Sequence, residues 1–228
     1  RIDGLFEGVL LETTVKTMKV QKNGLRVVLS DPQEKEQTRI FDQALVAVGR
    51  TPNTADLGLE KAQIDVDERG FIQVDHRQQT SAQSIFAVGD VVGEPMLAHK
   101  AIHEGRVAAE VIAGRKVGFE PAAIPAVVFT DPEIAWAGLT ETEAKKRGVA
   151  YIATRFPWGA SGRAATLGRS DGLTKLLVHE RSKRILGVGI IGPSAGELIA
   201  EGVLAIEMGA NATDLGLSIH PHPTLSET

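Results

Sequence analysis

The stretch "LTKLLVHERSKRILGVGIIGPSAGE", residues 173–197, carries the pattern that decides the fold of the second half of the sequence. Two runs rich in aliphatic residues, 173–180 and 184–192, are separated by turn residues, which is typical of strands. Ser194 and Glu197 then fit a capping box, in which two side chains satisfy N–H groups at a helix start. "GPSAGE" lacks the lysine of a phosphate-binding P-loop, so we interpret it as structural.

The same pattern continues toward the amino terminus. Further strands are expected at 126–130, 133–140 and 151–157, each bounded by turn residues. Thr140 and Glu143 fit a second capping box and predict a helix after the second of these strands. We therefore predict an α+β domain with an antiparallel sheet and helices on one side.

Residues 7–48 are predicted to be mostly β-structure. Asn23-Gly24, in the turn "QKNG", is a strong hairpin signal between the runs 8–20 and 24–30. Ala44 to Val48 forms a short apolar run of the kind found in strands buried on both faces. Two more short strands are expected, one in "GFIQVD" and one in "SIFAVGD".

A helix is predicted over residues 97–112. Small or aliphatic residues recur there at steps of three and four and predict one closely packed face, made of Ala98, Ala101, Gly105, Ala108 and Ile112. Gly114 is a natural stop for this helix. Residues 1–121 thus have the character of α/β part-domains.

Composition narrows the class of protein. The 228 residues carry a formal charge of −4, which disfavours a nucleic-acid partner, and they include no cysteine, so the chain itself has no disulfide, thiolate ligand or cysteine nucleophile. No apolar run approaches the roughly 20 residues that cross a bilayer, and no secretion signal is visible. We expect an intracellular protein without a membrane partner.

The segment "SIFAVGDVVGEPMLAHKA", residues 84–101, is the first candidate site. Asp90 follows an apolar strand and could accept hydrogen bonds from ligand hydroxyls, and the helix start near Met96 to Ala98 could hold a developing anion. The alternative is an aspartate that only forms a turn. Gly49, at the end of "ALVAVGRTPN", could let a ligand approach the backbone; the alternative is a domain-crossing turn in which Arg50 makes a structural ion pair.

The segment "HPHPTLSE", residues 220–227, is the second candidate site. A carboxylate of Glu227 on one ring nitrogen of His222 would fix the tautomer and leave the other nitrogen free to take a proton. His220 and His222 could instead share a metal ion, but no third ligand of suitable spacing is nearby, so we expect no metal. The remaining alternative is a surface histidine in a proline turn.

Four motifs together resemble the dihydrolipoamide dehydrogenase family of flavoprotein disulfide reductases, the E3 components of 2-oxo acid dehydrogenase complexes. They are "TSAQSIFAVGDVVGEPMLAHKAIHEGRVAAE", "AVVFTDPEIAWAGLT", "RILGVGIIGPSAGELI" and "HPHPTLSE", in the family's order and spacing. The family's Gly-rich FAD and NAD units and its Cys-x4-Cys are absent from the sequence, so we expect the carboxyl half of a longer enzyme that is inactive as a fragment.

The resemblance implies roles for the candidate residues. Residues 1–50 would be the last part of an NAD domain, with Gly49 beside NAD; residues 51–121 a central domain closing over FAD; and residues 122–228 the dimerisation domain. Asp90 would bind the ribityl chain of FAD, and the flavin pyrimidine ring would meet the helix start at Met96, Leu97, Ala98 and His99.

His222 would be the base that accepts the dihydrolipoamide thiol proton, oriented by Glu227, and would serve the partner subunit's site in a homodimer. Implied partners are lipoyl-bearing subunits of 2-oxo acid dehydrogenase complexes, and the implied location is the cytoplasm, or the mitochondrial matrix in a eukaryote. Two alternatives stay open: a sister disulfide reductase such as a glutathione reductase, and a non-catalytic dimerisation or docking module.

Overall fold

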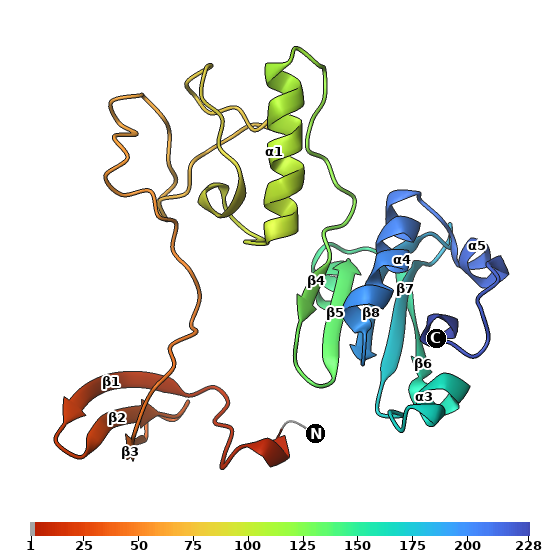
Figure 1. Ribbon diagram of the computed structural model, residues 1–228, viewed down its shortest axis with the longest axis horizontal. Helices are drawn as coiled ribbons and strands as arrows, with labels where there is room; N and C mark the ends of the chain where they lie inside the picture. The colour runs from red at the N-terminus through yellow and green to blue at the C-terminus, as the bar shows by residue number, and fades with distance from the viewer. Residues whose placement is uncertain (1–2) are drawn as a thin grey trace. The chain divides into compact units, whose positions relative to one another are not determined.

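The computed structural model describes residues 3–228, which divide into two compact units, one up to Thr51 and the other Pro52–Thr228. Figure 1 shows both units and labels most of their helices and strands. Each unit is described by itself below.

The first unit is a three-stranded antiparallel sheet after a short 3-10 helix, η1 (Asp3–Leu5). The strands are β1 (Thr14–Gln21), β2 (Gly24–Ser30) and β3 (Glu36–Phe41), in that order. Gln21 pairs with Gly24, and Gly24 has φ +126°, a value that favours glycine. The hairpin predicted from Asn23-Gly24 is therefore confirmed.

The predicted buried strand from Ala44 to Val48 is wrong. The structure has no strand there, and the side chains are open to solvent, with Leu45 95% and Val48 92% exposed. A strand buried on both faces needs paired neighbours and a covering layer on each side. Among the described residues of the first unit, the sheet ends at β3 and supplies neither.

The second unit begins with a largely irregular segment. The short strands predicted in 70–75 and 84–90 are wrong, because only single bridges form, Val66 with Ile72 and Gln79 with Phe86. Backbone groups bond across turns instead, as when the Ile72 N–H donates to Val91 O at 2.8 Å. A small apolar cluster of Ile64, Ile72 and Ala87 holds the segment together.

This segment leads into a 3-10 turn, η2 (Gly89–Val92), and then α1 (Ala98–Ile112), which confirms the predicted helix. Gly114 has φ +83° and its N–H donates to Val111 O at 2.9 Å, so the predicted stop is also confirmed. The predicted packing face is confirmed only in part: Ala108 is buried and Ala101 and Gly105 are half-buried, whereas Ala98 and Ile112 are exposed. The other buried residues of α1 are Lys100, Glu104 and Val111.

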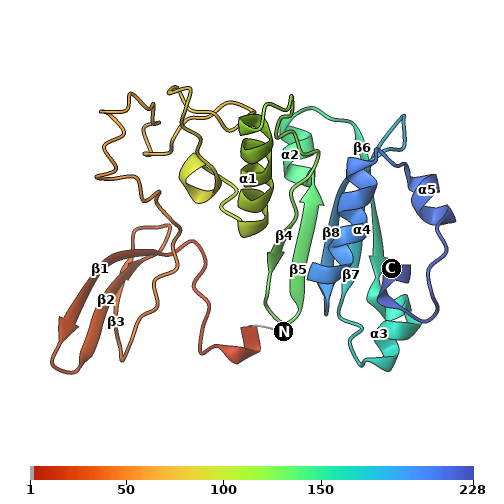
Figure 2. The ribbon, with the colours of Figure 1, turned by 45° about the horizontal axis from the view of Figure 1, so that its top comes forward.

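The rest of the second unit contains a five-stranded, fully antiparallel sheet of order β4-β5-β8-β7-β6 (Figure 2). Its strands are β4 (Ala126–Val128), β5 (Glu133–Gly138), β6 (Tyr151–Pro157), β7 (Leu173–His179) and β8 (Ile185–Gly192). All five strands predicted between residues 126 and 192 are confirmed.

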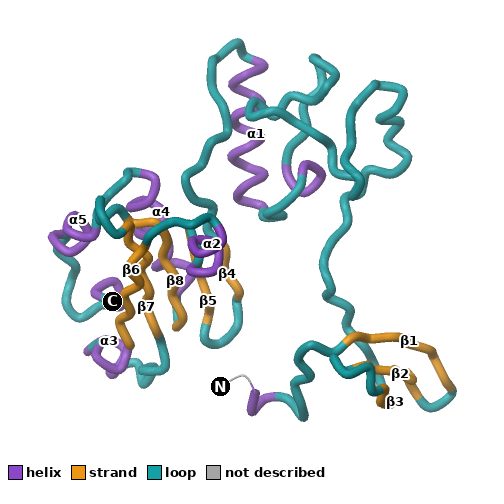
Figure 3. Tube along the Cα trace, turned by 180° about the vertical axis from the view of Figure 1, so that it is seen from behind, coloured by secondary structure: helices purple, strands orange, loops and turns teal. Residues whose placement is uncertain are grey.

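One face of this sheet packs against α4 (Ala195–Glu207), as the tube in Figure 3 also shows. The small, buried side chains of Ala135 and Ala137 let α4 pack close to the sheet. Gly202 of α4 lies so near that an added Cβ would be 2.8 Å from Val188 Cγ2. Trp158, fully buried, completes the same core beside Gly192. The prediction of an antiparallel sheet with helices on one side is confirmed.

The remaining short elements of this unit are α2 (Glu141–Lys146), η3 (Trp158–Ala160), α3 (Gly162–Thr166), α5 (Ala212–Leu217) and η4 (Leu225–Glu227). The capping box of Thr140 and Glu143 is present at the start of α2. The one predicted at α4 is wrong, because Ser194 has φ +61° and makes no side-chain cap bond. Glu133 Oε2 instead accepts the Gly196 N–H at 2.9 Å.

No helix in residues 3–228 is both long enough and apolar enough to cross a membrane.

Candidate functional site

The segment 218–228 leaves α5 as an extended chain and closes with the 3-10 turn η4. Proline rings at 221 and 223 restrict the backbone there, and Thr224 Oγ1 donates to Pro221 O at 2.7 Å. Glu227 bridges the turn: its Oε2 accepts the Thr224 N–H at 2.8 Å, and its Oε1 lies 2.9 Å from His222 Nδ1. The expected contact between His222 and Glu227 is thus present.

The pair has the geometry of an oriented proton acceptor. The pKa of Glu227 lies below its usual value, first because the Thr224 N–H bonds to the carboxylate and then because His222 does. An ionised Glu227 on Nδ1 favours the tautomer with the proton on that nitrogen, and Nε2 is then left to accept a proton. The His222 side chain is 77% exposed, so a substrate can reach it.

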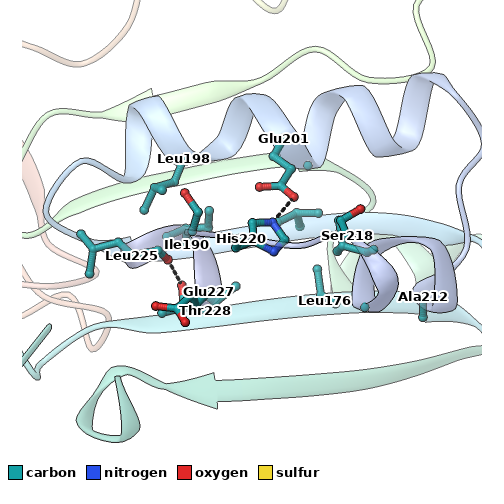
Figure 4. A pocket seen from close by; sticks show the side chains of 16 residues that line it. Leu176, Ile190, Leu198, Glu201, Ala212, Ser218, His220, Leu225, Glu227 and Thr228 are labelled. Carbon is teal, nitrogen blue, oxygen red and sulfur yellow. Dashed lines mark hydrogen bonds and ion pairs between the residues drawn. The ribbon is translucent and has the colours of Figure 1, made fainter. Parts of the chain in front are cut away.

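The neighbouring histidine has a different partner. His220 Nε2 lies 2.6 Å from Glu201 Oε1 of α4, and both side chains line a cavity of about 320 Å³ (Figure 4). Glu227 lines the same cavity near Leu225 and Thr228. Each histidine thus has its own carboxylate, and residues 3–228 hold no group of three His, Asp or Glu side chains placed to bind a metal ion.

The turn that carries Asp90 lies against the start of α1. Asp90 is exposed and is the second residue of η2, between Gly89 at φ +83° and Gly93 at φ +112°. Leu97 is the N-cap of α1 and makes no side-chain cap bond, so the first N–H groups of α1 lack that common partner. Met96 and Leu97 are half-buried, and Ala98 and His99 are exposed.

The His99 side chain has a contact that the sequence does not predict. Its Nε2 lies 2.7 Å from Pro125 O, which connects α1 to the chain just before β4. Gly49, in the first unit, is exposed at φ +126°, with nothing within 4 Å of an added Cβ.

Two family models match the chain. "Pyridine nucleotide-disulphide oxidoreductase, dimerisation domain" matches residues 124–228, and "Pyridine nucleotide-disulphide oxidoreductase" matches residues 8–105. The chain belongs to the pyridine nucleotide-disulphide oxidoreductase family. The resemblance inferred from the four motifs is confirmed.

Two curated relatives of the chain carry the same name. The chain is 49% identical over 220 residues to "Dihydrolipoyl dehydrogenase" of Vibrio cholerae, covering 96% of the chain and 46% of the relative. It is 53% identical over 224 residues to the protein of that name from Thermus scotoductus, covering 97% and 48%. The chain therefore spans about half the length of these curated relatives.

Solved structures of this family share the fold. The crystal structure of LpdA from Mycobacterium tuberculosis matches with a TM-score of 0.85 at 26% identity, over 94% of this chain and 46% of that one. The HOCl-induced flavoprotein disulfide reductase RclA from Escherichia coli matches at 28% identity with a TM-score of 0.83, over 94% and 48%.

The sequence predicted contacts within each candidate site but not the distant partners of its residues. His222 and Glu227 are five residues apart, and η2 and the start of α1 are neighbours in sequence, so a local motif can reveal them. Glu201 lies nineteen residues before His220 on another element, and no local signal connects the two. The same holds for Pro125 as the partner of His99.

Proposed function

We propose that the whole protein containing this chain is a dihydrolipoyl dehydrogenase, which oxidises dihydrolipoamide and reduces NAD+. The observation that carries the proposal is the exposed His222 ring, bonded through Nδ1 to Glu227 at 2.9 Å. The curated relatives named dihydrolipoyl dehydrogenase support the choice of substrate.

His222 accepts the proton of a dihydrolipoamide thiol at Nε2, because only the thiolate attacks a disulfide efficiently. Glu227 holds the ring in the required tautomer and stabilises the cation that forms, as the acid does in a Ser-His-Asp triad. The low pKa of Glu227, caused by the Thr224 N–H and then by His222, keeps its carboxylate ionised in this role. The disulfide itself must come from elsewhere, since this chain has no cysteine.

The turn η2 and the start of α1 fit FAD, which supplies electron transfer between the dithiol and NAD+ when bound. The exposed Asp90 carboxylate suits ribityl hydroxyls, and the uncapped N–H groups after Met96 and Leu97 suit an electron-rich ring edge, with Ala98 and His99 beside them. In the first unit, the open space around Gly49 suits a close approach of NAD to the backbone.

The domain roles follow the same proposal. Residues 1–50 belong to an NAD domain, 51–121 to a central domain that contacts FAD, and 122–228 to a dimerisation domain. The division between Thr51 and Pro52 and the family model over 124–228 support these limits.

The active unit is a homodimer in which His222 serves the partner subunit's site. Large apolar side chains on or next to α4 and α5 are exposed and would be covered by a second copy: Leu204, Met208, Leu217 and Ile219. Sedimentation of the whole protein should show a dimer. The remaining partners are lipoyl-bearing subunits of 2-oxo acid dehydrogenase complexes in the cytoplasm, or in the mitochondrial matrix of a eukaryote.

The test is NAD+ reduction by dihydrolipoamide with the whole protein and its His222→Gln variant. Removing a positioned base should lower turnover by at least about 10²-fold while flavin stays bound. His179→Gln is the matched control, because His179 is the last residue of β7 and its ring accepts a hydrogen bond from the Ser182 N–H. Near-normal turnover of His222→Gln would overturn the assignment, and turnover with glutathione disulfide and NADPH alone would indicate a sister reductase.

A further inference from the structure

A buried ion pair lies behind the turn that carries Asp90. Lys100 Nζ and Glu104 Oε1, one helical turn apart on α1, are 2.9 Å apart, and their side chains are only 6% and 3% exposed. Charged side chains are rarely this buried, because each loses its hydration. Apolar residues of similar size are often at least as stabilising at such positions, so fold stability alone does not account for the pair.

Each charge also bonds to the backbone of the turn. Glu104 Oε2 accepts the Gly89 N–H at 2.7 Å, and Lys100 Nζ donates to Gly93 O at 3.2 Å and to Gly89 O at 3.4 Å. The two side chains therefore fix both ends of η2, with Asp90 between them. Figure 2 shows η2, the yellow turn, beside α1.

The middle of the turn is held by the Ile72 N–H on Val91 O, so these bonds matter most at its two glycine ends. Gly89 and Gly93 have positive φ values and no side chains, so their conformational freedom in a loose turn would be large. The approach is also close, since a Cβ on Gly89 would lie 3.1 Å from Ala101 Cβ. Apolar residues at 100 and 104 would leave the Gly89 and Gly93 groups without these partners.

We propose that Lys100 and Glu104 are positioning residues that set η2 against α1 in the arrangement that binds FAD. The inference rests on the proposed flavin site. Neither side chain touches the ligand. They order the turn before binding, so FAD binding does not lose the free energy that ordering a loose turn would cost.

The test compares Lys100→Met with Arg106→Met in the whole protein, after flavin removal and reconstitution with FAD. Arg106 is the matched control, because it is on the same helix and also bonds to a glutamate four residues on, Glu110, but is largely exposed. Lys100→Met should raise the Kd for FAD at least about tenfold, since removing one partner strands a buried charge and frees the turn. Arg106→Met should leave the Kd unchanged.

A double variant separates positioning from stability. Lys100→Met with Glu104→Gln leaves no unpaired charge and keeps an acceptor for the Gly89 N–H, so its Tm should recover relative to Lys100→Met alone. The Gly89 and Gly93 carbonyls still lack their donor, so the Kd for FAD should stay raised. Recovery of both together, or a Kd that never changes, would overturn the proposal and leave the pair a purely structural role.

Hydrogen exchange of the apoprotein gives a readout that does not depend on flavin. Amides from 86 to 97 should exchange faster in Lys100→Met than in wild type, while amides of β7 and β8 stay protected. Failure of the wild-type protein to bind FAD would refute the proposed function, whereas unchanged exchange at the turn would refute the role of the ion pair.

Discussion

The two sheets of this molecule are built from similar sequence patterns but differ in how much they bury. Every residue of β1 and β3 is exposed, and buried side chains occur only in β2 among the described strands of the first unit. In the second unit, β8 is the central strand of five, and none of its residues is exposed. Hairpin signals thus form strands in both units, but within residues 3–228 a helix packs on one face of the second sheet and none packs on the first.

The difference shows what local signals determine. A turn such as Asn23-Gly24 sets register and pairing between neighbouring strands without help from the rest of the fold. Burial depends on a second layer, which α4 supplies to the five-stranded sheet. Stability should therefore be concentrated in the second unit.

The largest expected effect tests this directly with one substitution in each sheet of the 228-residue chain. Ile190→Ala in β8 removes a side chain that is 6% exposed and should cost about 2–5 kcal/mol of unfolding free energy. Ile40→Ala in β3 removes one that is 52% exposed and should cost within about 0.5 kcal/mol. Calorimetry is suitable because it detects unfolding of both units.

Equal costs at the two positions would contradict the comparison, because they would mean that the first sheet also has a covered face. A second measurement extends the comparison: Ile40→Ala could lower the unfolding free energy more in the whole protein than in this chain. That result would mean that other parts of the protein cover β3.

The second unit was predictable where strands pair with partners inside the chain. The five strands, α1 and the Thr140 cap follow from local patterns, and so do His222 and Glu227. The apolar run at 44–48 suggested a buried strand, but a sequence pattern does not say whether a partner is present. The burial of Lys100 and Glu104 was not expected, because the hydrogen bonds that offset their lost hydration come from the backbone of Gly89 and Gly93, in a separate turn.

An intermediate effect concerns two helix starts within the second unit, one held locally and one held by a distant contact. Thr140 Oγ1 accepts the Glu143 N–H at 3.2 Å, so Thr140→Ala should lower the unfolding free energy by about 1 kcal/mol. Ser194 makes no cap bond, so Ser194→Ala should have little effect. Chemical denaturation of the two variants measures both.

Equal destabilisation by Thr140→Ala and Ser194→Ala would contradict this, because it would mean that Ser194 does stabilise the start of α4, as the sequence predicted. Glu133→Gln extends the test, because Glu133 Oε2 accepts the Gly196 N–H and so performs part of the role predicted for Ser194. We expect it to destabilise the second unit more than Ser194→Ala does.

The smallest expected effect lies on the sheet face away from α4, which is partly exposed as the first sheet is. Glu141 accepts hydrogen bonds there from Lys175 Nζ at 2.7 Å and from Arg155 Nη2 at 2.9 Å. Chiefly because of Lys175, the pKa of Glu141 lies below its ordinary value of 4.5. The folded state then favours the ionised carboxylate, so this contribution is present above about pH 4.5 and is lost as the pH falls through the lowered value.

An NMR titration of the Glu141 carboxyl carbon measures this effect at a single site. Lys175→Met should move the Glu141 pKa upward toward its ordinary value, and Arg155→Met should move it less, because the Lys175 bond is the principal cause. The stability change should be small in both variants, since solvent screens exposed pairs. A larger pKa shift from Arg155→Met than from Lys175→Met would mean that the exposed arginine, and not the half-buried lysine, is the main cause of the lowered Glu141 pKa.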